Sequence, residues 1–129
     1  MSKTKMSPKD MERRLINFSA KIFLITEKLK SSEANRVMRL QLLRSSSSSA
    51  LNYGEVQGSE SLKDFIHKMR IILKELRETM ISLKIIKITN PKMDSQELDD
   101  AIDECDELIA ITVSSVKTAE FRLSGQEKE

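Results

Sequence analysis

The chain has 129 residues, of which 39% are hydrophobic and 33% charged, with three Gly, two Pro and no Trp. This length fits one domain that buries a core without disulfides or a structural metal. The scarcity of turn-forming residues excludes a many-stranded β protein. No apolar stretch approaches the ~20 residues of a membrane span, and residues 1–9 lack the apolar core of a signal peptide. With Cys105 alone and unable to form an internal disulfide, we expect a cytoplasmic protein without membrane contact.

Charge is distributed unevenly along the chain. Residues 1–92 hold 19 Lys and Arg against 9 Asp and Glu, a net charge of +10, and residues 93–129 hold 3 against 11, a net charge of −8. The first three-quarters of the chain is therefore basic and the last quarter acidic.

The first predicted helix covers residues 8–30. It opens with a serine, a proline and an acid at Ser7, Pro8 and Asp10, which is the typical start of a helix. Apolar residues then alternate spacings of four and three, which predicts one buried stripe: Met11, Leu15, Phe18, Ile22, Ile25 and Leu29.

The second predicted helix covers residues 32–58 and contains five consecutive serines at 45–49. A flexible linker is the alternative reading of such a run. We favour a helix because apolar and small residues before and after the run stay in one helical phase. The expected buried stripe is Leu40, Leu43, Ser47, Ala50 and Gly54.

The third and fourth predicted helices cover residues 60–88 and 94–123, separated by Asn90 and Pro91 and followed by a frayed tail at 124–129. Their expected buried stripes are Leu62, Ile66, Met69, Leu73, Leu76, Met80 and Leu83, and Leu98, Ile102, Cys105, Ile109, Thr112, Val116 and Ala119. Four long helices with short connections predict a single all-α domain over residues 1–129, an antiparallel up-down-up-down four-helix bundle.

A set of residues in the middle of the chain carries a family resemblance. Its elements, in order, are Arg44, a run of small residues, Asn52-x-x-Glu55, a turn with Gly58, the aromatic Phe65, and the block Lys74-Glu75-x-x-Glu78-Thr79. In this order and spacing the segment resembles the four-helix-bundle family of 23S rRNA intervening-sequence proteins, and more distantly the accessory proteins of diversity-generating retroelements. The resemblance implies a bacterial protein that assembles as a homopentamer and has no enzymatic activity.

The chain offers little for catalysis or for a cofactor. A di-iron bundle needs inward Glu residues with two Glu-x-x-His pairs, but His67 is the only histidine and Asp64 stands three residues before it. No arginine lies within residues 60–66, as a helical ribonuclease would require just before its histidine. The acidic run at 99–107 lacks the glycine turn of a calcium loop. We expect no enzyme, no metal and no cofactor.

Pairing the second and third helices around a turn near residue 59 places Arg44 opposite Glu75 and Asn52 opposite His67. The alternatives are a surface ion pair and a buried polar network between helices or protomers. We expect the buried network, made of Arg44, Asn52, Glu55, Glu75 and Glu78.

Two functional classes remain open. The first is a non-enzymatic oligomer that binds RNA or a nucleoprotein through basic residues of the first three helices, and the alternative is an oligomeric scaffold that binds a protein partner without nucleic acid. The candidate RNA contacts are Arg13, Arg14, Lys21, Arg36, Arg39, Lys63, Lys68 and Arg70. Self-association is expected because six apolar residues fall outside the best stripes: Ile16, Phe23, Ile71, Ile81, Ile85 and Ile111.

Overall fold

The computed structural model describes residues 6–128 and consists of four helices. They are α1 (Pro8–Glu27), α2 (Glu33–Val56), α3 (Leu62–Thr89) and α4 (Ser95–Lys128). Within the described residues the fold is all-α, as the sequence predicts. The helix bounds lie within three residues of the predicted ones, except at the end of α4. The predicted frayed tail from residue 124 is wrong, because α4 continues as a helix to Lys128; residue 129 lies outside the described residues, as do residues 1–5.

Short polar side chains begin each helix. The hydroxyls of Ser7, Ser32 and Ser61 each accept a hydrogen bond from the backbone N–H three residues ahead, at 3.0 to 3.1 Å. The carboxylate of Asp94 accepts from the N–H of Gln96 at 3.0 Å in the same way. These bonds satisfy amides that have no partner inside the helix, which explains why the helices begin where they do.

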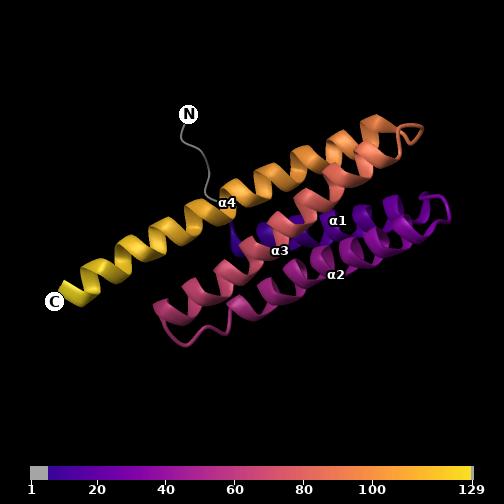
Figure 1. Ribbon diagram of the computed structural model, residues 1–129. Coiled ribbons are helices and arrows are strands. Elements are labelled where there is room, and N and C mark those ends of the chain that lie inside the picture. Colours follow the sequence, from indigo (N-terminus) through magenta and orange to yellow (C-terminus); the bar gives the residue numbers. More distant parts are fainter. Residues whose placement is uncertain (1–5, 129) are drawn as a thin grey trace.

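The four helices form an antiparallel bundle whose connections alternate between its two ends (Figure 1). α2 packs between α1 and α3, and α4 packs on α3 and closes the bundle against α1. Within residues 6–128, α1 does not approach α3 closely, nor does α2 approach α4, so these pairs occupy the diagonals. The α1–α2 and α3–α4 connections therefore share one end of the bundle, and the last turns of α4 lie away from α1. No helix in the described part of the chain is long and apolar enough to cross a membrane.

The core confirms most of the predicted buried stripes. All six predicted positions of α1 are buried, from Met11 to Leu29. In α3 and α4 most predicted positions are buried, whereas Leu62, Leu73, Ile102 and Ile109 are half-buried. α3 also buries residues that were not predicted to lie in the core, including Ile72 and Ile86, which are both fully buried.

The predicted buried stripe of α2 is wrong. Leu40 is 55% exposed and Gly54 is also exposed, and Leu43, Ser47 and Ala50 are half-buried. The helix instead buries a stripe rotated by about a third of a turn: Asn35, Leu42, Ser45, Ser46, Ser49, Tyr53 and Val56.

The buried serines of α2 explain this orientation. The hydroxyl of Ser45 lies 2.7 Å from that of Thr79 on α3, and Ser46 lies 3.4 Å from Ser19 on α1. Ser49 donates to the carbonyl of Ser46 at 2.7 Å. Because every buried hydroxyl has a partner, a serine face can enter the core at little cost while letting the helices approach closely. The prediction that residues 45–49 are helical is confirmed.

Candidate functional site

An ion-pair network joins α2 to α3. The Arg44 guanidinium donates to both carboxylate oxygens of Glu75, at 3.2 and 3.3 Å, and to Glu78. Glu75 also accepts from Ser48 Oγ at 3.0 Å, and Gln41 donates to Glu78 at 3.3 Å. The pKa of Arg44 is raised above its ordinary value, mainly by its hydrogen bond to Glu78.

The network differs from the predicted one in burial and membership. Glu75 is buried at 7% exposure, but the Arg44 side chain is 52% exposed, so the expected fully buried network is wrong. Asn52 touches the network through Ser48, to which its amide donates at 3.0 Å. Glu55 is exposed and its carboxylate takes no part, and His67 is exposed as well. The arrangement holds two helices together.

The predicted RNA contacts are scattered over the bundle and most of them are occupied. Seven of the eight bind a partner within their own chain: Arg13 with Asp10, Arg14 with Glu104 and Glu107, Arg36 with Glu33, Arg39 with the carbonyls of Thr26 and Leu29, Lys63 with Glu127, Lys68 with Asp64, and Arg70 with Glu120. Lys21 has no such partner in residues 6–128. The structure therefore does not bring these residues together as one surface.

The acidic helix α4 accounts for much of this pairing. Its carboxylates neutralise basic residues of α1 and α3, including Arg14 at 2.6 Å and Lys28 at 2.7 Å. The half-buried pair of Arg14 with Glu104 raises the pKa of the arginine. Part of the excess positive charge in the first three-quarters of the sequence is thus neutralised by carboxylates of α4 within the same chain.

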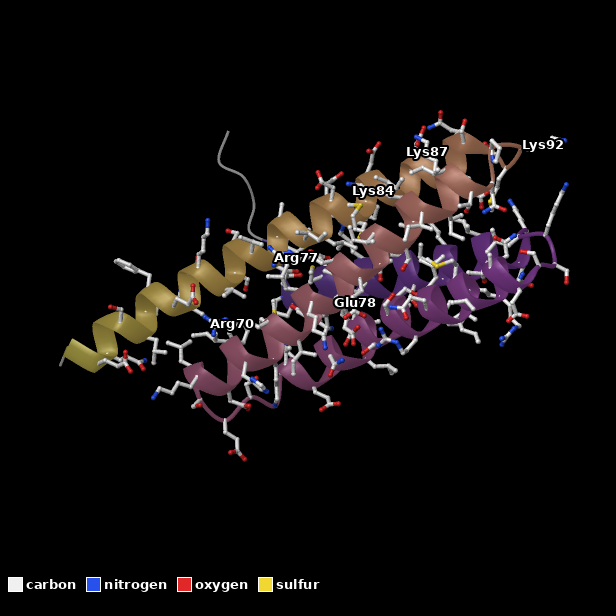
Figure 2. All side chains as sticks on the ribbon, in the orientation of Figure 1. Arg70, Arg77, Glu78, Lys84, Lys87 and Lys92 are labelled. Atoms are coloured by element: carbon white, nitrogen blue, oxygen red, sulfur yellow. The ribbon has the colours of Figure 1, made fainter. Side chains whose placement is uncertain are left out.

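A cluster of lysines that the sequence analysis did not select gathers at the end of the bundle where the α1–α2 and α3–α4 connections lie. We call it the lysine end: Lys28, Lys30, Lys84, Lys87 and Lys92. Figure 2 shows Lys84 and Lys87 along α3 and Lys92 in the connection beyond it. Lys28 pairs with Glu97 and Lys87 with Asp99, whereas Lys30, Lys84 and Lys92 have no carboxylate partner in the described chain.

The two connections enclose a cavity of about 310 Å³ at this end. Lys28 and Lys30 line it from one connection, and Asn90 and Lys92 line it from the other. Charge spacing along the sequence could not reveal this cluster, because its lysines come from two segments of the chain about 60 positions apart, such as Lys30 and Lys92. Ammonium groups and a side-chain amide around one hollow can bind a phosphate-sized anion.

Exposed apolar side chains form two faces. The α1/α2 face carries Ile16 and Phe23 from α1 and Leu40 and Leu51 from α2. The α2/α3 face carries Val37 from α2 and Ile81 and Ile85 from α3. Four of the six residues predicted to lie outside the core, Ile16, Phe23, Ile81 and Ile85, are exposed, and Ile71 and Ile111 are half-buried.

A second cavity and the buried cysteine do not belong to the lysine end. A cavity of about 390 Å³ lies between the start of α1, the end of α2, the start of α3 and the second half of α4; its described lining includes Tyr53, Phe65 and Arg122 but no carboxylate, histidine or cysteine. Cys105 is buried and donates to the carbonyl of Leu76 at 3.3 Å, and burial raises its pKa to about 12. Within residues 6–128 no group of three potential ligand side chains could hold a metal ion.

Comparisons with known proteins support the resemblance seen in the sequence. Residues 10–114 match the family model described as 23S rRNA-intervening sequence protein. The fold is similar to a crystal structure of a protein of unknown function from the S23 ribosomal protein family of Bacteroides thetaiotaomicron, with a TM-score of 0.76 and 25% identity. That match covers 85% of this chain and 97% of the other. No curated protein matches the chain significantly.

Proposed function

From the premise that this chain belongs to the 23S rRNA-intervening sequence protein family, we propose that it is a non-enzymatic, homo-oligomeric bundle protein of the bacterial cytoplasm. Its proposed activity is to bind RNA, free or within a nucleoprotein, at the lysine end. The observation that carries this proposal is the cavity between the two connections, which has lysines on both sides; two of them, Lys30 and Lys92, have no carboxylate partner within residues 6–128.

The side chains at the lysine end favour recognition of phosphates over recognition of bases. Lysine binds phosphate as a point charge, and each contact with a phosphate releases counterions and so makes binding dependent on salt. Within the described chain, no aromatic residue lines the cavity. Phe18 and Tyr53 are buried, Phe65 is half-buried, Phe121 lies on the second half of α4, and the exposed Phe23 belongs to the α1/α2 face. With no stacking platform in the cavity, the proposed ligand is structured RNA contacted through its backbone.

Self-association is the second part of the proposal. A folded monomer rarely leaves large apolar side chains exposed in groups, and such groups mark contact surfaces. The two apolar faces of the bundle are groups of this kind. Five copies is the number that the family resemblance implies. Symmetry would then repeat the lysine end in every copy and multiply its attraction for a polyanion.

An oligomeric scaffold that binds a protein without nucleic acid is the alternative. The observation in its favour is that Ile88, beside Lys84 and Lys87, is among the most exposed apolar residues of the bundle. An apolar side chain of this size contributes nothing to phosphate binding but suits a protein interface.

Binding to a labelled RNA hairpin, measured by fluorescence anisotropy, tests the proposal. We expect the affinity to fall steeply, by about 100-fold or more, as salt rises from about 50 to about 300 mM. The Lys30→Glu/Lys92→Glu variant should lose at least tenfold in affinity and keep its oligomeric mass. Lys9→Glu/Lys117→Glu is the matched control, since both residues are exposed lysines without a carboxylate partner elsewhere on the described bundle. No binding at the lowest salt concentration would reject the RNA proposal in favour of the scaffold.

A further inference from the structure

We propose that neighbouring copies of this chain join through unlike surfaces, the α1/α2 face of one copy packing on the α2/α3 face of the next. This inference rests on the homo-oligomer proposed above and names the contact that builds it. The occupant of each face is a second copy of this chain, and the argument comes from the charges around the two apolar groups.

The α1/α2 face is apolar with unpaired acids beside it. Ile16 and Phe23 are exposed and lie two turns apart on α1, on either side of Ser19, whose hydroxyl lies 3.4 Å from that of Ser46 on α2. Glu12 and Glu27 flank the two apolar residues of α1 along the helix, and both are exposed. Neither carboxylate forms an ion pair or a hydrogen bond within residues 6–128.

The α2/α3 face is apolar with unpaired bases beside it. Ile81 and Ile85 lie one turn apart on α3, and Lys74 and Arg77 are exposed on the turns before them. Lys74, Arg77 and Ile81 line a shallow hollow of about 460 Å³ together with Gln41 of α2. The carboxylate of Glu78 also lines this hollow, but it is already paired with Arg44. Figure 2 shows Arg77 on the outward side of α3, and neither basic residue forms an ion pair or a side-chain hydrogen bond in the described chain.

The charges decide which faces meet. If two α1/α2 faces met, the carboxylates of Glu12 and Glu27 in one copy would approach the same carboxylates in the other. If two α2/α3 faces met, the cations of Lys74 and Arg77 would approach each other in the same way. Like charges pressed into a partly dehydrated contact repel, and opposite charges attract and fix the register. The unlike pairing brings two acids to two bases around an apolar centre, which is the usual anatomy of a protein interface.

The position of the two faces determines the kind of assembly. Contacts between unlike surfaces produce closed rings or open filaments, depending on the rotation between successive copies. Both faces border α2, on its α1 side and on its α3 side, so they lie on adjacent sides of the bundle rather than on opposite ones. Each copy is then turned relative to the last, in the same direction, as a closed ring requires.

Reversing the charges tests the inference by light scattering coupled to size-exclusion chromatography. We expect Glu12→Lys/Glu27→Lys and Lys74→Glu/Arg77→Glu each to reduce the mass to that of one chain, 14.8 kDa. The variant with all four changes should regain the oligomer, because the charges on its two faces are exchanged. Mixing the two double variants should also restore assembly, since each then presents a face that fits the other.

Asp103→Lys/Asp106→Lys is the matched control, because these exposed acids lie on the outward side of α4 without an ion-pair partner in the described residues. It should keep the oligomeric mass, and circular dichroism should show every variant to be helical. A monomeric wild-type protein would overturn the homo-oligomer itself. A wild-type oligomer whose mass survives either double charge reversal would overturn the pairing of unlike faces and leave the proposed function standing.

Discussion

Asn35 at the start of α2 and Asn90 after the end of α3 exchange side-chain amide hydrogen bonds. The amide of Asn35 donates to Asn90 Oδ1 at 3.1 Å, and the amide of Asn90 donates back to Asn35 Oδ1 at 3.2 Å. Asn35 also donates to the carbonyl of Lys30 at 2.9 Å, and Asn90 donates to that of Ile86 at 3.1 Å. The pair therefore fastens the α1–α2 connection to the end of α3 beneath the lysine end.

Replacing Asn35 with alanine should lower the free energy of unfolding by about 1–3 kcal/mol, because Asn90 and the carbonyl of Lys30 lose a buried partner together. Urea unfolding followed by circular dichroism measures the change. Asn52→Ala is the control, since the amide bonds of Asn52 stay within α2. Equal unfolding midpoints for the two variants would show that the pair between the connections adds no stability beyond that of a local bond.

The Arg44→Ala variant should lose about 1–2 kcal/mol of stability. Glu75 then keeps only Ser48 as a donor while its carboxylate stays buried. The loss is smaller than for a fully buried pair because half of the Arg44 side chain faces solvent. Arg44→Lys should lie between, since it keeps the charge without the planar fork.

Arg36→Ala is the matched comparison for the Arg44 variant, because both partners of the Arg36 pair with Glu33 are exposed. Its melting temperature should barely change. A melting temperature equally unchanged in Arg44→Ala would mean that Glu75 is satisfied without the arginine.

Most of the fold follows from the sequence. The stripe from Met11 to Leu29 has large apolar residues at every fourth and third position, so only one face of α1 can be the buried one, and the structure agrees. The caps of the first and fourth helices follow from Ser7 and Asp94, which can satisfy the first free amides. Four helices of this kind joined by short connections are enough to predict the fold class.

The orientation of α2 and the lysine end could not be derived in this way. Between Arg44 and Ala50 the helix carries only serine, so two stripes with the same spacing compete, and the choice depends on partners such as Thr79 on another helix. The intrachain partners of the candidate RNA contacts were hidden for a related reason. The charge of a residue is visible in the sequence, but its neutralisation by a carboxylate about 90 positions away, as in Arg14 with Glu104, is not.

Two leucines test the orientation of α2 directly. Leu42 is fully buried and Leu40 is 55% exposed, two positions apart on the same helix. Leu42→Asp places an unpaired carboxylate in the core and should abolish cooperative folding. Leu40→Asp should remain helical and melt cooperatively, and it should lose the oligomer because Leu40 belongs to the α1/α2 face. The opposite pattern in thermal melts would restore the stripe that contains Leu40.

The thiol of Cys105 should be unreactive in the folded protein. Its pKa of about 12 leaves almost no thiolate at neutral pH, and the side chain is fully buried between α3 and α4. Labelling with a thiol reagent should be slow in buffer and immediate in denaturant, with a native rate that follows global unfolding. The Leu42→Asp variant provides the unfolded reference at the same pH. Rapid labelling of the native wild-type protein would show that the α3–α4 contact opens locally.

The same shift makes stability depend on pH in the alkaline range. In the unfolded chain the Cys105 thiol ionises near its ordinary pKa of about 9, whereas in the folded protein the pKa is about 12 because burial disfavours the thiolate. Because the folded pKa is higher than the unfolded pKa, the protonated thiol contributes its full stability below the unfolded pKa, and this contribution is lost as pH rises toward the folded pKa.

The Cys105→Ala variant cannot ionise at this position. The difference in unfolding free energy between wild type and variant should therefore shrink by about 1.4 kcal/mol per pH unit above pH 9. Urea unfolding of both proteins at several pH values between 8 and 11 measures that difference. Because the two proteins differ only at position 105, the contributions of all other groups cancel. A difference that stays constant over this range would mean that the thiol ionises equally well in the folded protein, and that the site between α3 and α4 admits water.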